Sequence, residues 1–131
     1  MRKDIEIPKV ENVHIVAIKE WDKDFSEQQW NIYLVNNRKD EIETVLVMSR
    51  GKSEDRKTST LRHGLGNMNP KTSARVEFIS TEVLGFTNEY LVTFFAENKL
   101  FERKFIFKPN SISEEKVTKL PVMEDEGILA K

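Results

Sequence analysis

The sequence predicts an all-β protein with an immunoglobulin-like antiparallel sandwich of about seven strands. Apolar residues, rich in Val, Ile, Phe and Tyr, recur with the period of two that marks half-buried strands. Clusters of Asn, Asp, Lys and Gly separate these runs at spacings typical of sandwiches and small barrels. Helical periodicity is nearly absent, which disfavours parallel strands joined by helices. A small five- or six-stranded barrel is the alternative architecture.

The first part of the chain divides into one strand and a hairpin. Alternating apolar residues predict a strand over 12–19. The stretch "QWNIYLVNNRKDEIETVLVMS" then predicts a strand over 29–36, a turn over 37–40 and a return strand over 42–49. We expect the last two strands to pair with each other.

The middle of the chain predicts an edge strand followed by a turn. Residues 58–63 alternate but carry little apolar surface, which is typical of an edge strand. The following "GLGNMNP", residues 64–70, is rich in turn formers and is expected to end that strand. A strand over 73–80 comes next, with Val76 and Phe78 as expected core residues.

Two strands over 89–96 and 100–108 give the strongest pattern in the sequence. Their aromatic and apolar residues recur at even spacing, so each row occupies one face of a pleated strand. We predict that these rows are core residues that pack on one another and do not form a platform for stacking on bases. The two rows are Phe101, Phe105 and Phe107, and Tyr90, Val92 and Phe94.

The last segment, 113–131, is expected to be a short helix or a tail of the same domain. Ser113 is a candidate N-cap, and two glutamates follow it in the first turn. The sequence contains no repeat or linker, so a single domain over 1–131 is predicted.

Composition excludes several classes of protein. The chain has 131 residues, of which 33% are charged and 38% hydrophobic, and it contains no cysteine. Disulfides, thiolate metal sites and a cysteine nucleophile are therefore excluded. No apolar run resembles a secretory signal or a transmembrane helix, so a cytoplasmic location is expected. Nothing in the sequence predicts a metal or another cofactor.

Charge is balanced globally, at a net charge of −1, but is distributed unevenly. Residues 49–75 contain seven cations against two acids, whereas 114–131 contain five acids against three lysines. The basic middle and the acidic end could pair with one another, within one molecule or between two. Interleaved Ser, Thr and Asn also make the segment a candidate surface for nucleic-acid phosphates, although it has no aromatic residue for base stacking. This candidate basic surface comprises Arg50, Lys52, Arg56, Lys57, Arg62, His63, Lys71 and Arg75.

The sequence predicts no catalytic set. His63 follows Arg62 and could act as a general acid or contact a phosphate. The neighbouring sequence supplies no orienting carboxylate or nucleophile, and the glycines after His63 suit a chain reversal. A carboxylate beside His63 in a concave pocket would favour an enzyme. His14, in the middle of a strand, is expected to be structural.

Three stretches carry a resemblance to a known family: "VMSRGKSEDRKTSTLRHGLG", "EYLVTFFAENKLFERKFIFKPNSI" and "LPVMEDEGILAK". They resemble small bacterial proteins of uncharacterised function, some of which bear the label phenylalanyl-tRNA synthetase alpha subunit. A class II synthetase site needs a large antiparallel sheet, ATP-binding arginines in separated motifs and an amino-acid pocket. Because 131 residues of short strands cannot supply these, we expect the label to be an error. The resemblance carries no site residue over.

From these observations we expect a non-catalytic β-sandwich that acts through protein contacts, including self-association. Pairing at the edge strand, or docking of the acidic tail on the basic segment, would be its mechanism. The alternative is an accessory nucleic-acid-binding domain that uses the basic 50–75 segment.

Overall fold

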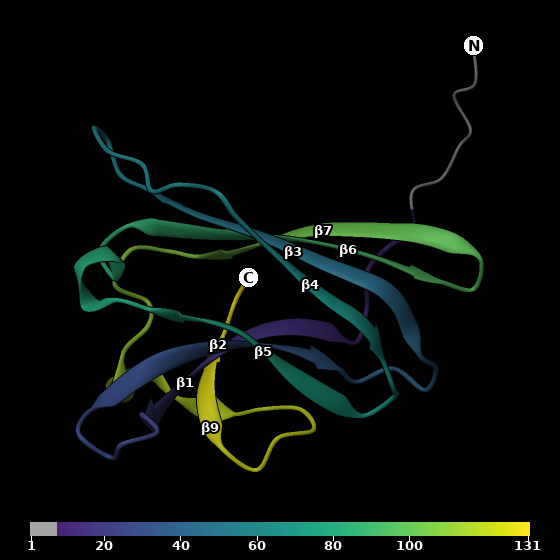
Figure 1. Cartoon of the computed structure of the whole chain (residues 1–131), viewed down its shortest axis with the longest axis horizontal. Helices are drawn as coiled ribbons and strands as arrows, with labels where there is room; N and C mark the ends of the chain where they lie inside the picture. Colours follow the sequence, from purple (N-terminus) through teal and green to yellow (C-terminus); the bar gives the residue numbers. More distant parts are fainter. Residues whose placement is uncertain (1–7) are drawn as a thin grey trace.

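A computed structural model describes residues 8–131 and contains two antiparallel sheets packed face to face (Figure 1). One sheet has the order β5-β2-β1-β9-β8 and the other the order β4-β3-β6-β7. This arrangement confirms the predicted all-β sandwich, with nine strands instead of about seven. Residues 1–7, where no signal segment is predicted, lie outside the described residues. The strands are β1 (Val13–Trp21), β2 (Gln28–Asn36), β3 (Ile42–Lys52), β4 (Leu61–Met68), β5 (Thr72–Ile79), β6 (Thr87–Ala96), β7 (Lys99–Phe107), β8 (Thr118–Lys119) and β9 (Glu126–Leu129).

The strand order is that of an immunoglobulin-like sandwich. The sheet β4-β3-β6-β7 corresponds to strands C′, C, F and G of the variable-type fold, and β5-β2-β1 corresponds to E, B and A. Strand D, which lies beside E in immunoglobulin sheets, has no counterpart among the described residues, because β4 connects directly to β5. Strands β8 and β9 extend the other edge of their sheet beyond β1.

The predicted hairpin between 29–36 and 42–49 is wrong, because its two strands belong to different sheets. β2 pairs with β1, and β3 pairs with β6 and β4. The chain crosses between the sheets at Asn36, which is fully buried. Its amide nitrogen donates to the main-chain oxygens of Asp40, Met68 and Asn69 at 3.1, 3.2 and 3.1 Å. A short turn fits either a hairpin or a crossover, so the local sequence does not distinguish them.

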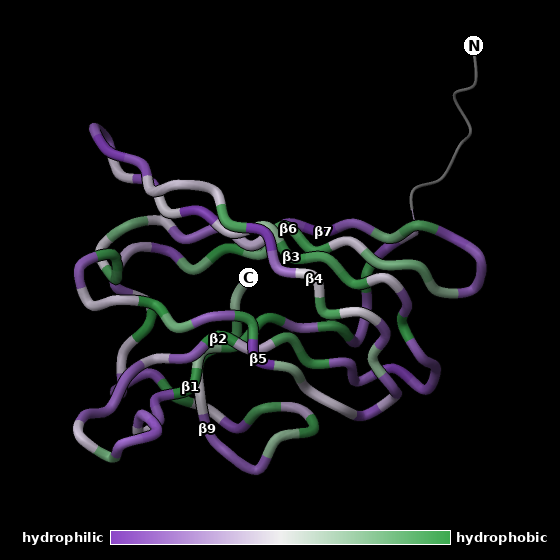
Figure 2. Tube along the Cα trace, in the orientation of Figure 1, coloured by the Kyte–Doolittle hydropathy of each residue, from purple (hydrophilic) through white to green (hydrophobic). Residues whose placement is uncertain are grey.

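The core lies between the sheets, where hydrophobic residues alternate along the strands while the arm joining β3 to β4 is hydrophilic (Figure 2). The predicted aromatic rows are confirmed as core residues, since all six are at most 4% exposed. Phe94 stacks on Phe101 with ring centroids 5.1 Å apart, and Tyr90 meets Phe107 edge to face at 6.0 Å. Such pairs add to the stabilisation that burial of the rings provides.

The edge strand is confirmed, but it is displaced along the chain. β4 covers Leu61–Met68, not 58–63, and is the outermost strand of its sheet. The glycines of "GLGNMNP" therefore lie within the strand, and only residues 69–71 form the turn. Gly66 has a φ of 69° at a break in the pairing with β3. A glycine takes this left-handed conformation without strain, which lets an irregular strand continue where a turn was expected.

Phe78 is not a core residue, because it is 55% exposed, whereas Val76 is buried as predicted. A β-bulge in β5 causes this difference. Ile32 of β2 is opposite Glu77 and Tyr33 is opposite Arg75, so Val76 is an extra residue with no partner. Side chains alternate between faces along a regular strand, and one extra residue reverses the alternation beyond it.

The C-terminal segment docks on the sandwich as strands. Ser113 caps a single 3-10 turn, Glu114–Lys116, because its hydroxyl accepts the N–H of Glu115 at 3.4 Å. The short helix predicted at 113 is thus reduced to this turn. β9 pairs with β1, and the main chains of Lys131 and Ile106 exchange two hydrogen bonds at 2.9 and 3.0 Å. These residues tie β1 of one sheet to β7 of the other and close one side of the sandwich.

Within residues 8–131 the two helical segments are three-residue turns, and no helix is long and apolar enough to cross a membrane.

Candidate functional site

The other side of the sandwich, which we call the open side, is bordered by two edge strands. β4 is the last strand of one sheet and β5 the last of the other, and both leave the turn at residues 69–71 and then diverge (Figure 1). Where they separate, a cleft of about 530 Å³ opens between the sheets. Both sheets contribute to its lining, so it is a product of the tertiary fold.

Glu77 lies in this cleft because of the bulge in β5. Its cross-strand partner, Ile32, is a fully buried core residue, so the Glu77 side chain faces the interior between the sheets. In a regular strand Glu77 would face outward and Phe78 inward. The bulge therefore places a carboxylate at the mouth of an apolar core.

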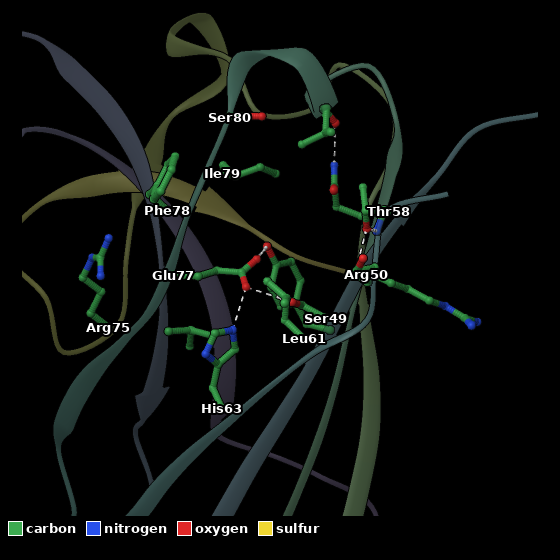
Figure 3. A pocket seen from close by; sticks show the side chains of 16 residues that line it. Ser49, Arg50, Thr58, Leu61, His63, Arg75, Glu77, Phe78, Ile79 and Ser80 are labelled. Carbon is green, nitrogen blue, oxygen red and sulfur yellow. Dashed lines mark hydrogen bonds and ion pairs between the residues drawn. The ribbon is translucent and has the colours of Figure 1, made fainter. Parts of the chain in front are cut away.

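Three side chains from the opposite sheet donate hydrogen bonds to the Glu77 carboxylate (Figure 3). Ser49 Oγ and His63 Nε2 each lie 2.8 Å from Oε1. Tyr90 Oη donates to Oε2 at 2.9 Å. Ser49 and Tyr90 are 4% and 1% exposed, so Glu77 is the partner that satisfies two buried hydroxyl groups.

The contact with Glu77 determines the protonation pattern of its neighbours. A carboxylate only accepts, so Nε2 of His63 carries a proton toward Glu77, and in the neutral tautomer with that proton Nδ1 is an acceptor. Burial, together with the Glu77 charge, raises the pKa of Tyr90 far above its ordinary value. The phenol therefore stays protonated and remains a donor to Glu77 at every ordinary pH.

The walls of the cleft are mostly apolar. Leu61 from β4 and Phe78 from β5 stand at its rim and are 50% and 55% exposed. Behind them lie side chains that are buried or half-buried, namely Val76, Ile79 and Val83. The site thus combines a hydrogen-bonded carboxylate floor with apolar walls, as is common in pockets that bind ligands.

His63 lines a pocket beside a carboxylate, which is the arrangement that would favour an enzyme. Glu77 can orient the imidazole as the acid of a catalytic triad does. A nucleophile would have to contact the free Nδ1 of His63, whereas the Ser49 hydroxyl donates to Glu77. The contacts therefore describe a bridge between the sheets, without an activated nucleophile among the residues that the structure describes.

The predicted basic surface is divided among different parts of the molecule. Arg50 and Lys52 lie on the outer face of the four-stranded sheet and pair with Glu89 at 2.9 and 3.0 Å. Burial alone would raise the pKa of Glu89, but the hydrogen bonds from Lys52 and Arg50 outweigh it and lower that pKa. Glu89 thus stays ionised and offsets part of the positive charge. Arg62 is exposed on the same face.

The other members of that set are further apart. Arg56 lies over the ring of Phe86, 5.3 Å from its centroid, and Lys57 is exposed in the same arm. Lys71 lies in the turn after β4, at the other end of that strand, and its ammonium donates to Asn37 in the connection between β2 and β3. The guanidinium of Arg75 donates to Asn31 at 3.2 Å on the outer face of the other sheet. Three members of the set border the cleft, namely Arg50, His63 and Arg75, and of these only the His63 side chain contacts Glu77.

The acidic tail does not dock on the basic segment within one molecule. β9, which begins with the acidic residue Glu126, pairs with β1, and Glu114 pairs with Lys19 of β1 at 3.3 Å. The tail therefore packs on the five-stranded sheet instead of the 49–75 segment of the same molecule.

Sequence reasoning missed Glu77, Tyr90 and Ser49 as site residues. Glu77 is fourteen positions from His63, so inspection of the sequence near His63 could not find its carboxylate. The available signal was an acid between two apolar residues, Val76 and Phe78, at the apolar end of a strand. His14 is half-buried in β1, in keeping with the structural role expected of it.

In residues 8–131 no group of three His, Cys, Asp or Glu side chains could hold a metal ion. Comparisons with protein-family models, curated proteins and solved structures found no match to this chain. The cleft and its two edge strands are therefore the features of this chain that point to a function.

Proposed function

We propose that the protein is a non-catalytic interaction domain whose open side binds an extended segment of a protein partner, which can be a second copy of this chain. The observation that carries the proposal is the pair of edge strands, β4 and β5, that flank the cleft. Each presents main-chain N–H and C=O groups that a further strand can pair with.

The fold supports this mode of binding in two ways. The partner segment would occupy the place of the immunoglobulin strand D, beside β5. On the opposite side of the sandwich the chain itself supplies such a segment, because β9 pairs with β1 and Lys131 pairs with Ile106. The open side has no equivalent segment within the described chain.

The bulge limits how long the added strand can be. Bulges and irregular pairing are ways in which natural proteins protect edges from indiscriminate pairing. β5 is interrupted at Val76 and β4 near Gly66, so a partner can pair regularly only near the wide end of the cleft. Exposed Leu61 and Phe78 lie at that end and supply apolar contact area. Selectivity among partner sequences would then come from contacts in the cleft and not from a long series of main-chain hydrogen bonds.

A selection from a display library of random linear peptides tests the proposal without a known partner. Enriched peptides are measured against the wild type, Leu61→Lys and Phe78→Lys, with Phe95→Lys as the matched control. Phe95 is also an exposed aromatic residue, but it lies on the outer face of the four-stranded sheet. We expect both rim variants to weaken binding at least about tenfold and the control to leave it unchanged.

Two further measurements complete the test. A paired strand directs every second N–H group to the edge strand. N-methylation of either the odd-numbered or the even-numbered peptide residues should therefore abolish binding, and methylation of the other set should not. Light scattering during size exclusion reports whether the partner is a second copy, in which case Leu61→Lys should dissociate it. A monomer that selects no peptide, or peptides that bind all three lysine variants equally well, would overturn the proposal.

A further inference from the structure

We propose that the cleft accepts the side chain of a lysine or arginine from the partner strand, with Glu77 as its counter-ion. This inference rests on the proposed function for the strand that delivers the side chain. It concerns a separate property, namely the chemistry that the floor of the cleft recognises.

Glu77 and its three donors, Ser49, His63 and Tyr90, form the floor of the cleft, and the donors already bind Glu77. The hydroxyls of Ser49 and Tyr90 and the Nε2–H of His63 all donate to the one carboxylate. The groups that remain for a ligand are lone pairs, on Glu77 Oε2, on His63 Nδ1 and on the hydroxyl oxygens. A ligand that complements these acceptors must carry hydrogen-bond donors.

Other polar side chains around the cleft are also committed as donors. Thr58 Oγ1 donates to the main-chain oxygen of Ser59 at 3.1 Å. The Asn88 amide donates to the main-chain oxygens of Val83 and Phe86 at 2.9 and 3.3 Å. Its carbonyl oxygen remains an acceptor. Ser59 and Ser80 are exposed, and Figure 3 shows Ser80 away from Glu77.

The charge of the floor is negative even though two arginines border the cleft. Figure 3 shows Arg50 and Arg75 directed away from Glu77, on opposite sides. Arg50 binds Glu89 at 2.9 Å and Arg75 binds Asn31 at 3.2 Å, both on outer faces of the sheets. Glu77, with a side chain only 16% exposed, has no Lys or Arg partner among residues 8–131. A cation that enters the cleft would supply one.

The walls fit the rest of such a side chain. Lysine and arginine have an aliphatic stem between the main chain and the charge, and this stem packs readily on apolar surface. Leu61, Val76 and Ile79 line the path toward Glu77.

Competing chemistries fit the cleft less well. An anionic ligand would meet the Glu77 charge with no free donor on the floor to offset it. An apolar side chain would seal Glu77 from water without pairing its charge, which is costly. A lysine or arginine seals the cleft, pairs the charge and donates to the open acceptors, so it satisfies all three requirements.

Matched charged and neutral probes test this inference on the unmodified protein. NMR titrations that follow the His63 ring nitrogens use Nα-acetyl-lysine amide and Nα-acetyl-arginine amide. Their neutral counterparts are Nα-acetyl-norleucine amide and Nα-acetyl-citrulline amide. We expect both cationic probes to shift the His63 resonances, with Kd on the order of millimolar, and the neutral ones to bind at least about tenfold more weakly. Glu77→Gln should abolish this difference.

The peptides from the display selection separate this inference from the proposed function. A selected peptide should contain a Lys or Arg whose replacement by norleucine or citrulline weakens binding at least about tenfold. Peptides that bind at the rim yet tolerate this replacement would sink the inference and leave the proposed function intact. If the protein is a monomer and the library yields no binder, the proposed function fails, and the probe titration alone decides the inference: equal binding of the charged and neutral probes refutes it.

Discussion

Replacing Glu77 by alanine should destabilise the protein, because it removes the acceptor of two buried hydroxyl groups. Ser49 and Tyr90 are almost inaccessible to solvent, and each would be left with an unsatisfied donor. A buried polar group without a partner costs about 1 to 3 kcal/mol, so the two together cost about 2 to 6 kcal/mol. Water that enters from the cleft would bind the two hydroxyl groups, so the loss of unfolding free energy would then be closer to about 2 kcal/mol. Against an ordinary stability of about 5 to 15 kcal/mol, this is a large effect.

Chemical denaturation of a double-mutant cycle measures the effect and isolates its cause. Tyr90→Phe alone removes one hydrogen bond to a charged group and should cost about 1.5 to 3 kcal/mol. In the Glu77→Ala background the same change removes an orphaned hydroxyl, so it should cost close to nothing. Glu102→Ala, an exposed acid on β7, is the matched control and should stay within about 0.5 kcal/mol of wild type. Additive effects of the two substitutions, within about 0.5 kcal/mol, would refute the bridging role of Glu77.

Three further predictions concern the rest of the fold. Phe105→Ala should cost about 3 to 5 kcal/mol by leaving a cavity in the core, whereas Phe95→Ala, at a residue that is 44% exposed, should cost below about 1 kcal/mol by the same denaturation assay. Burial lowers the pKa of His14, so its contribution to stability is present above about pH 6.5 and is lost as the pH falls through its folded pKa; His14→Gln should flatten the measured dependence of stability on pH in that window. Gly127→Ala would drive a methyl group into a main-chain carbonyl of β1 and should lower the melting temperature, whereas Gly64→Ala, where the added methyl meets no atom, should change it far less.

The parts of the fold that follow from periodicity could be predicted. β6 and β7 alternate regularly, and their aromatic rows proved to be buried as the spacing indicates. The edge position of β4 could be predicted from its lack of apolar residues. In these strands the local pattern and the tertiary environment agree, so the pattern alone is sufficient.

The parts that failed depend on partners that are distant in sequence. The turn after Asn36 is short enough for a hairpin, and only the buried contacts to Met68 and Asn69 direct the chain into the other sheet. The bulge at Val76 is likewise set by pairing with β2. Because that bulge decides which face Glu77 occupies, the candidate site could not be predicted before the pairing was known.

The bulge at Val76 also bears on how β5 finds its register as the chain folds. The residues before it and those after it follow alternations of opposite phase, so a regular ladder with β2 would bury Phe78 and expose Glu77 and Ile79. Such a ladder buries an aromatic ring and is an attractive competitor during folding. The three hydrogen bonds to Glu77 form only in the bulged register, since only there does the carboxylate reach Ser49, His63 and Tyr90. The hydrogen bonds to Glu77 thus favour the bulged register over a regular one that hydrophobic burial alone would also stabilise.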